Sequence, residues 1–143
     1  MGTLYDSDFY GWTQEQADLL RSGHLSELDT QNLLEEIEAM GRSERRELES
    51  RLQVLLMHLL KWQYQVDHQG RSWKLTIEEQ RRKAGRVLSE NPSLKPRLSE
   101  MLAAAYGDAV IGAERETNIK RSVFPAEWPW TIGQVMDPEF WPE

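Results

Sequence analysis

The chain has 143 residues, of which 39% are hydrophobic, and this suits one compact domain with a core of its own. It carries 24 acidic and 17 basic residues, and the net charge of −7 argues against a protein that coats nucleic acid. Because cysteine is absent, disulfides, thiolate metal sites and cysteine nucleophiles are excluded. The longest apolar run, residues 54–60, is too short for a membrane span, and the N-terminus does not resemble a signal peptide. We therefore expect a soluble, cytoplasmic protein.

The N-terminal stretch, residues 1–12, is aromatic and acidic. We predict an arm held on the domain by Tyr5, Phe9 and Trp12, with a partner-binding peptide as the alternative. Thr13 is expected to cap the first helix, with Gln16 as its capping-box partner. Gly23 supplies the left-handed residue that ends this helix.

A second helix is expected from a cap at Asp29 to Gly41. Its predicted buried stripe consists of Leu33, Leu34, Ile37 and Met40. The opposite face is acidic, with Glu35, Glu36 and Glu38. A carboxylate metal site on a bundle pairs glutamate with a histidine three residues on, and no E-x-x-H occurs in the chain, so we interpret this face as solvated and expect no metal or other cofactor.

A long central helix is predicted over residues 43–68, either separate from the second helix or nearly continuous with it through a kink at Gly41. One apolar stripe is formed by Leu48, Leu52, Leu55, Leu59, Trp62 and Val66. A second face is formed by Leu56, Met57, Leu60 and Tyr64. A helix that is apolar nearly all round is buried on two sides, either by its own chain or by a second copy. His58 lies on this helix, and we interpret it as a hydrogen-bonded histidine at the edge of the core, against a base, ligand or pH switch.

The strongest local charge belongs to a fourth predicted helix, which is capped by Ser72 and ends near Glu90. Residues 71–86 contain two acidic residues and six basic ones, namely Arg71, Lys74, Arg81, Arg82, Lys83 and Arg86. One hypothesis is a phosphate or nucleic-acid surface with Trp62, Tyr64 and Trp73 as stacking partners. The favoured one is an exposed face on which Glu78 pairs with Arg82 and Glu79 with Lys83, while the aromatic rings belong to the core.

A fifth, alanine-rich helical stripe runs from Leu94 to Ala113, and Gly107 is a possible break in it. Beyond Asn118 the chain is rich in proline and aromatic residues, and Thr131 is predicted to cap one short turn through Met136. We expect residues 119–143 to form an extended strap over hydrophobic grooves, because its five large rings are too many to leave in water. The predicted fold is thus all-α, a single domain over residues 1–143 with five to six helices around a long central helix.

Four stretches carry a family resemblance: LYDSDFYGWTQEQADLLRSG, LLEEIEAMGRSERRELESRLQVLLMHLLKWQYQ, SW..TI.EQRR and FP..WPWT...VMD..FWPE. Together they resemble the bacterial domain-of-unknown-function family 29 over nearly the whole chain. The resemblance implies an all-helical, soluble bacterial protein of no established activity, so it assigns no catalytic residue. Its signature positions here are Asp8, Phe9, Trp12, Glu35, Glu36, Gly41, His58, Trp62, Gln63, Trp73 and Arg81.

Three functional hypotheses follow. The first is a non-enzymatic interaction or regulatory module that acts as a homodimer through Leu56, Met57, Leu60 and Tyr64, with a possible protein partner and no membrane association. The second is nucleic-acid or phosphate-ligand binding through the basic helix, for which the steep salt dependence of binding would be the sign. The third is an enzyme in which His58 acts with Glu35 and Glu36.

Overall fold

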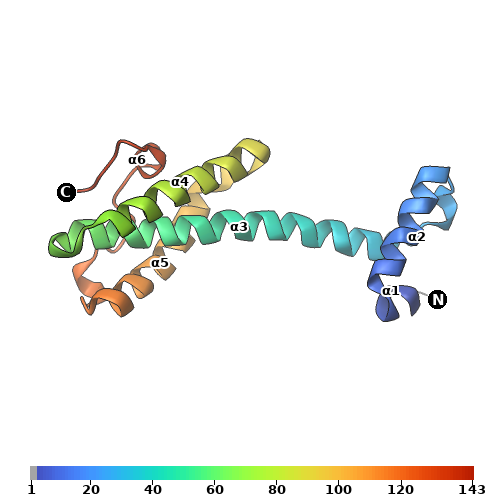
Figure 1. Cartoon of the computed structure of the whole chain (residues 1–143), viewed down its shortest axis with the longest axis horizontal. Coiled ribbons are helices and arrows are strands. Elements are labelled where there is room, and N and C mark those ends of the chain that lie inside the picture. The colour runs from blue at the N-terminus through green and yellow to red at the C-terminus, as the bar shows by residue number, and fades with distance from the viewer. Residues whose placement is uncertain (1–2) are drawn as a thin grey trace. The chain divides into compact units, whose positions relative to one another are not determined.

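A computed structural model describes residues 3–143, and more than half of the chain is α-helical (Figure 1). The helices are α1 (Thr3–Ser7), α2 (Phe9–Ser22), α3 (Thr30–Tyr64), α4 (Arg71–Glu90), α5 (Leu98–Thr117) and α6 (Ile132–Met136). Short 3-10 turns lie at Leu25–Glu27, Val66–His68, Pro92–Arg97 and Arg121–Val123. No strand occurs among the described residues, so the all-α prediction is confirmed. None of the described helices is both long enough and apolar enough to cross a membrane.

The chain forms two compact units, residues 1–43 (unit 1) and residues 44–143 (unit 2), and the boundary falls within α3. We predicted a single domain with an N-terminal arm. The first two residues of that arm lie outside the described part, and the rest of it, apart from Asp8, is helical, in α1 and the start of α2. The second and central helices of the prediction are one helix that continues through Gly41.

In unit 1, α2 begins at Phe9, four residues before the predicted start. Asp8 caps it by accepting a hydrogen bond from the Gly11 amide at 3.0 Å. The predicted cap Thr13 lies within the helix, where its hydroxyl donates to the Tyr10 carbonyl at 2.7 Å. The prediction of Thr13 as the cap was wrong, because the helix begins earlier, where the Asp8 carboxylate accepts from a free amide of the first turn. The end of the helix was predicted correctly, since Gly23 adopts a φ of 78°.

Unit 1 is held together by polar contacts around a few aromatic rings. Gln16, predicted as a capping partner, is buried and accepts a hydrogen bond from the Asp29 amide at 2.8 Å. The buried Trp12 donates through Nε1 to Asp29 Oδ2 at 3.0 Å. Tyr5 packs edge-on against Trp12, with the ring centroids 4.8 Å apart, and donates to Glu36 Oε2 at 2.5 Å. The first half of α3 therefore meets the rest of its own unit largely through polar groups.

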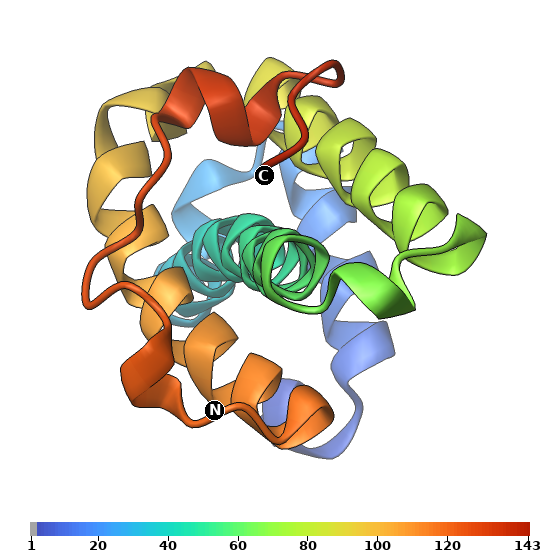
Figure 2. The ribbon, with the colours of Figure 1, turned by 90° about the vertical axis from the view of Figure 1, so that its left-hand side faces the viewer.

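In unit 2, the second half of α3 lies inside a layer made of α4, α5 and the C-terminal segment (Figure 2). Six of its leucines have no exposed surface at all: Leu48, Leu52, Leu55, Leu56, Leu59 and Leu60. This is the arrangement expected of a helix that is apolar nearly all round. The helix ends at Tyr64, four residues earlier than predicted. Gln69 Nε2 donates to the free Trp62 carbonyl at 2.8 Å and so satisfies part of that end.

The C-terminal strap, residues 119–143, completes the core of unit 2. Phe124 and Trp130 are buried in it, and Tyr106 of α5 donates its hydroxyl to the Pro125 carbonyl at 2.7 Å. Burial raises the pKa of Tyr106 to about 12. Thr131 forms the predicted cap of the short helix α6, as a reciprocal capping box with Gln134. The Ala-rich helix α5 is continuous through Gly107, so the predicted break is absent.

Candidate functional site

Arg81 differs from the other basic residues of α4 because it is buried. It follows Ile77 by four residues and precedes Ala84 by three, which places it on the buried face of α4. Only 5% of its surface is exposed. Nε donates to the Val135 carbonyl at 2.9 Å and Nη2 donates to the Phe140 carbonyl at 2.8 Å. Arg81 therefore ties the C-terminal strap to α4.

The charge of Arg81 has no direct counter-ion within the described part of the chain, where no carboxylate forms an ion pair with it. Burial lowers the pKa of the guanidinium, and Asp137 opposes this shift only at longer range. Both Arg81 and Lys74 lie over the ring of Trp141, with Cζ at 5.5 Å and Nζ at 5.9 Å from its centroid. Two cations thus share one aromatic ring.

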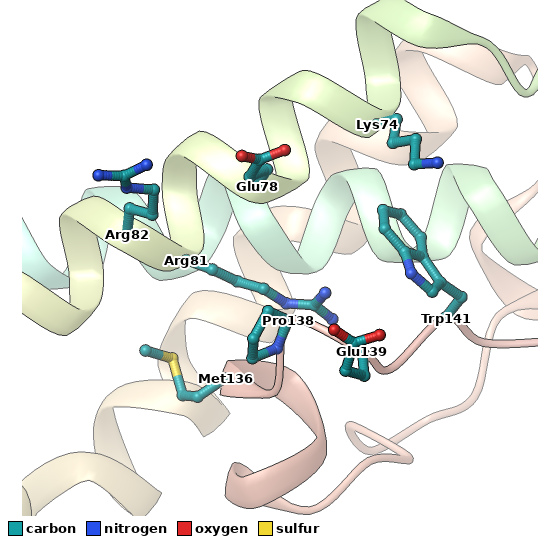
Figure 3. A pocket seen from close by; sticks show the side chains of 8 residues that line it. All are labelled: Lys74, Glu78, Arg81, Arg82, Met136, Pro138, Glu139 and Trp141. Atoms are coloured by element: carbon teal, nitrogen blue, oxygen red, sulfur yellow. The ribbon is translucent and has the colours of Figure 1, made fainter.

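A cavity of about 610 Å³ opens beside these groups (Figure 3). It is lined by Lys74, Glu78, Arg81, Arg82, Met136, Pro138, Glu139 and Trp141. Figure 3 shows Lys74, Glu78 and Arg82 along α4, while Arg81 reaches toward Pro138 and Glu139 of the strap. We call this the α4–strap cavity. It combines three cations and two carboxylates with apolar walls.

The other basic residues of α4 are more ordinary. Arg82 is exposed, and Lys83 forms the predicted pair with Glu79 at a distance of 3.5 Å. The predicted pair of Glu78 with Arg82 is not among the ion pairs of the described residues. The proposed stacking rings are partly covered by their own chain. Trp62 packs on Trp141 with centroids 4.7 Å apart, and Lys61 lies over Trp73 at 4.7 Å.

Sequence reasoning missed the charge at Lys61. Its side chain is buried, and Nζ lies 2.6 Å from Glu116 Oε1 on α5. The position is apolar by periodicity, and its partner lies 55 residues away, so no local pattern indicated the pair. A buried lysine requires such a partner.

His58 is half-buried, and its Nδ1 lies 2.9 Å from the Val54 carbonyl. A carbonyl can only accept, so Nδ1 carries the proton of this hydrogen bond. Burial lowers the pKa of His58, with a smaller contribution from Lys61 in the same direction. Glu35 and Glu36, its predicted catalytic partners, belong to unit 1, where Glu36 accepts the Tyr5 hydroxyl. The structure thus presents His58 as a hydrogen-bonded side chain at the edge of the core.

The predicted buried stripe of the second helix is wrong. Leu34 is 57% exposed, Ile37 58% and Met40 61%, and only Leu33 is half-buried. The inward face of this part of α3 carries Glu36, and Asp29 directly precedes the helix. These two carboxylates accept hydrogen bonds from Tyr5 of α1 and Trp12 of α2. The side chains of Leu34, Ile37 and Met40 are not covered by these contacts. We call Leu34, Ile37 and Met40 the exposed stripe.

The predicted self-association surface is also wrong in its location. Leu56 and Leu60 are fully buried, and Met57 and Tyr64 pack against the same core within one chain. Tyr64 meets Phe124 of the strap edge-on, with centroids 5.1 Å apart. The chain therefore covers the second face of α3 itself. Self-association through another surface stays a prediction.

The fold and these sites define the chain as an all-α protein with a long helix shared by two units. The family model described as "Domain of unknown function DUF29" matches residues 4–141, so the chain belongs to this family. Neither a curated protein nor a solved structure matches it.

Proposed function

We propose that this protein is a non-enzymatic interaction module whose partner docks on the exposed stripe of unit 1. The observation that carries the proposal is the exposure of Leu34, Ile37 and Met40, each more than half open on successive turns of one helix. Single exposed apolar residues are common, whereas several on one helical face are typical of an interaction site. An amphipathic helix of a partner could pack its apolar face on side chains at this spacing.

The charge of the chain indicates the chemistry of the partner. Residues 1–43 contain nine acidic and two basic residues, a net charge of −7. The remaining residues contain fifteen of each and are neutral overall. The stripe thus lies in the unit that holds the whole net charge, and Glu35 and Glu38 are exposed beside it. A basic amphipathic helix complements both its apolar surface and its charge.

A second copy of the chain is the competing occupant, since a two-fold dimer would match the stripe to itself. It would also bring together two copies of unit 1, each with a net charge of −7, and their repulsion costs electrostatic free energy. We therefore favour a basic partner over the homodimer. A nucleic-acid surface on α4 is a weaker alternative, because Arg81 is buried in the core and Lys83 is paired with Glu79.

The test uses a synthetic basic amphipathic helix of leucine and lysine, with a scrambled peptide of the same composition as the ligand control. Binding to the wild type is compared with binding to Ile37→Gln and to Ile111→Gln, a matched isoleucine that is 40% exposed on α5. We expect the amphipathic peptide to bind the wild type and Ile111→Gln in the micromolar range. Ile37→Gln should weaken binding by roughly tenfold, the loss of one apolar anchor.

Three outcomes would contradict the proposal. Equal binding of the scrambled peptide would mean attraction of charge alone. A wild-type dimer that dissociates on Ile37→Gln, measured by sedimentation, would assign the stripe to self-association. A large drop in melting temperature for Ile37→Gln would mean that the stripe is packed within the chain.

A further inference from the structure

The guanidinium of Arg81 has hydrogen-bond donors that no group in the described part of the chain accepts from. Two of its three guanidinium nitrogens donate to backbone carbonyls, and among the described residues no hydrogen bond involves Nη1. Carbonyl oxygens satisfy N–H groups but bring no negative charge. Arg81 is only 5% exposed and the hydrogen-bond acceptors of its guanidinium are both neutral carbonyls, so the group keeps a surplus positive charge.

Further positive charge faces the same space. Lys74 and Arg82 line the α4–strap cavity with Arg81, and neither forms an ion pair among the described residues. Glu78 and Glu139 also line it, so the five charged groups sum to +1. These carboxylates are exposed and compete with any bound anion for the cations.

One part of the cavity wall is apolar. Met136, Pro138 and Trp141 come from the strap, and the indole of Trp141 lies under both Lys74 and Arg81. The volume of about 610 Å³ falls within the range of small-molecule sites. An inorganic ion would use the cations and leave the apolar walls uncovered.

We propose that the α4–strap cavity binds a small organic oxyanion, a phosphate or carboxylate attached to a flat apolar body. The oxyanion accepts hydrogen bonds from the free Nη1 of Arg81 and ion-pairs with Lys74 and Arg82. The apolar body packs on Trp141 and Met136. This site lies wholly within unit 2 and does not depend on the exposed stripe of unit 1.

The experiment titrates the full chain with phenyl phosphate, benzoate and inorganic phosphate at constant ionic strength. Binding is followed by calorimetry and by the indole N–H signal of Trp141 in NMR spectra, assigned with a Trp141→Phe variant. We expect phenyl phosphate or benzoate to bind at least roughly tenfold more tightly than inorganic phosphate, because only they have an apolar body. The tighter of the two identifies the oxyanion.

The variants avoid Arg81, whose loss would disturb the strap. Lys74→Gln and Arg82→Gln remove exposed cations, and each should weaken binding by roughly three- to tenfold. Glu139→Gln removes a competing carboxylate and should strengthen binding by a similar factor. Lys83→Gln is the control, because this lysine lies on the same helix but outside the cavity.

Several results would overturn the proposal. No saturable binding of either organic anion by about 10 mM would do so, since a specific small-molecule site binds its ligand more tightly than this. An equal effect of Lys83→Gln, Lys74→Gln and Arg82→Gln would mean general attraction to α4. Tighter binding of a single-stranded oligonucleotide, weakened by Lys83→Gln and Arg86→Gln, would assign the helix to nucleic acid instead.

Discussion

At the scale of single residues, burial decides what the charged side chains of unit 2 do. Lys61 and Arg81 occupy inward positions of their helices, and each finds a different solution. Lys61 ion-pairs with Glu116, whereas Arg81 donates to carbonyls of the strap. His58 is less buried and keeps only a hydrogen bond to its own helix. Glu116 neutralises the charge of Lys61, whereas the charge of Arg81 has no such partner within residues 3–143 and is the one that we propose binds a ligand.

His58 makes a prediction about pH. Burial holds its pKa below the ordinary value of about 6.5, so the unfolded chain takes up the proton more readily than the folded chain. The free energy of unfolding should therefore fall as the pH drops from about 7.5 through 6.5 to the lower pKa of the folded state. Denaturant unfolding of wild type and His58→Gln at about pH 7.5 and 5.5 checks this. The wild type should lose more free energy of unfolding than the variant over this range.

The control for this prediction is His24→Gln, since His24 is exposed in unit 1. The part of the pH dependence that His58→Gln removes and His24→Gln retains is the part assigned to His58. If His58→Gln loses as much stability between the two pH values as the wild type, then His58 does not titrate as proposed.

At the scale of elements, α3 carries two kinds of packing on one helix. Its first half meets the rest of unit 1 through Glu36 and the adjoining Asp29, and leaves the exposed stripe outward. Its second half is covered on both sides by α4, α5 and the strap. The helix α5 packs closely against α3 because Gly112 has no side chain. A Cβ atom at Gly112 would lie 2.7 Å from Met57 Sδ, whereas one at Gly107 would meet nothing within 4 Å.

These two glycines of α5 predict opposite effects of the same substitution. Gly107→Ala should raise the free energy of unfolding by about 0.5–1 kcal/mol, because alanine loses less backbone freedom in a helix. Gly112→Ala should lower it by roughly 1 kcal/mol, because the methyl group displaces the half-buried Met57. Denaturant unfolding of both variants measures the difference. In a Gly112→Ala background, Met57→Ala should cost less than it does in the wild type. Equal stabilisation by both alanines would refute the close contact.

At the scale of the whole molecule, the two units differ in how much they bury. Among residues 4–43, whose side chains the structure describes, the buried ones are Trp12 and Gln16. Unit 2 has a continuous core drawn from α3, α4, α5 and the strap. A unit with few buried apolar side chains opens at low free energy. We therefore expect unit 1 to open at a lower free energy than unit 2, which would suit the proposed binding of a partner on unit 1.

This contrast predicts the pattern of hydrogen exchange. Backbone amides of α2 and of residues 33–40 should exchange at least roughly tenfold faster than those of residues 52–60. Trp12→Phe removes the hydrogen bond to Asp29 and should speed exchange in unit 1 alone. Mass spectrometry of peptic fragments measures both. Equal protection of the two regions, or faster exchange in both after Trp12→Phe, would mean that the units open together.

The sequence by itself determined the features that depend on near neighbours. The presence of the longer helices, the cap at Asp29, the stop at Gly23, the cap at Thr131 and the pair of Glu79 with Lys83 all follow from groups within about five residues of one another. Family membership also followed from the sequence, because its motifs extend along the chain.

Only the tertiary structure decided which face of each helix lies inward. Periodicity predicts that Leu34 and Ile37 share a face, but the polar contacts from Tyr5 and Trp12 do not cover that face. The sequence predicts Arg81 as one of six surface cations. In the structure it is buried and donates to carbonyls that lie 54 and 59 residues away in the chain. The second face of α3 allowed either a dimer interface or burial within one chain, and α5 and the strap cover it. In each case the deciding partner is distant in the chain, and no local pattern specifies which distant group will cover a face.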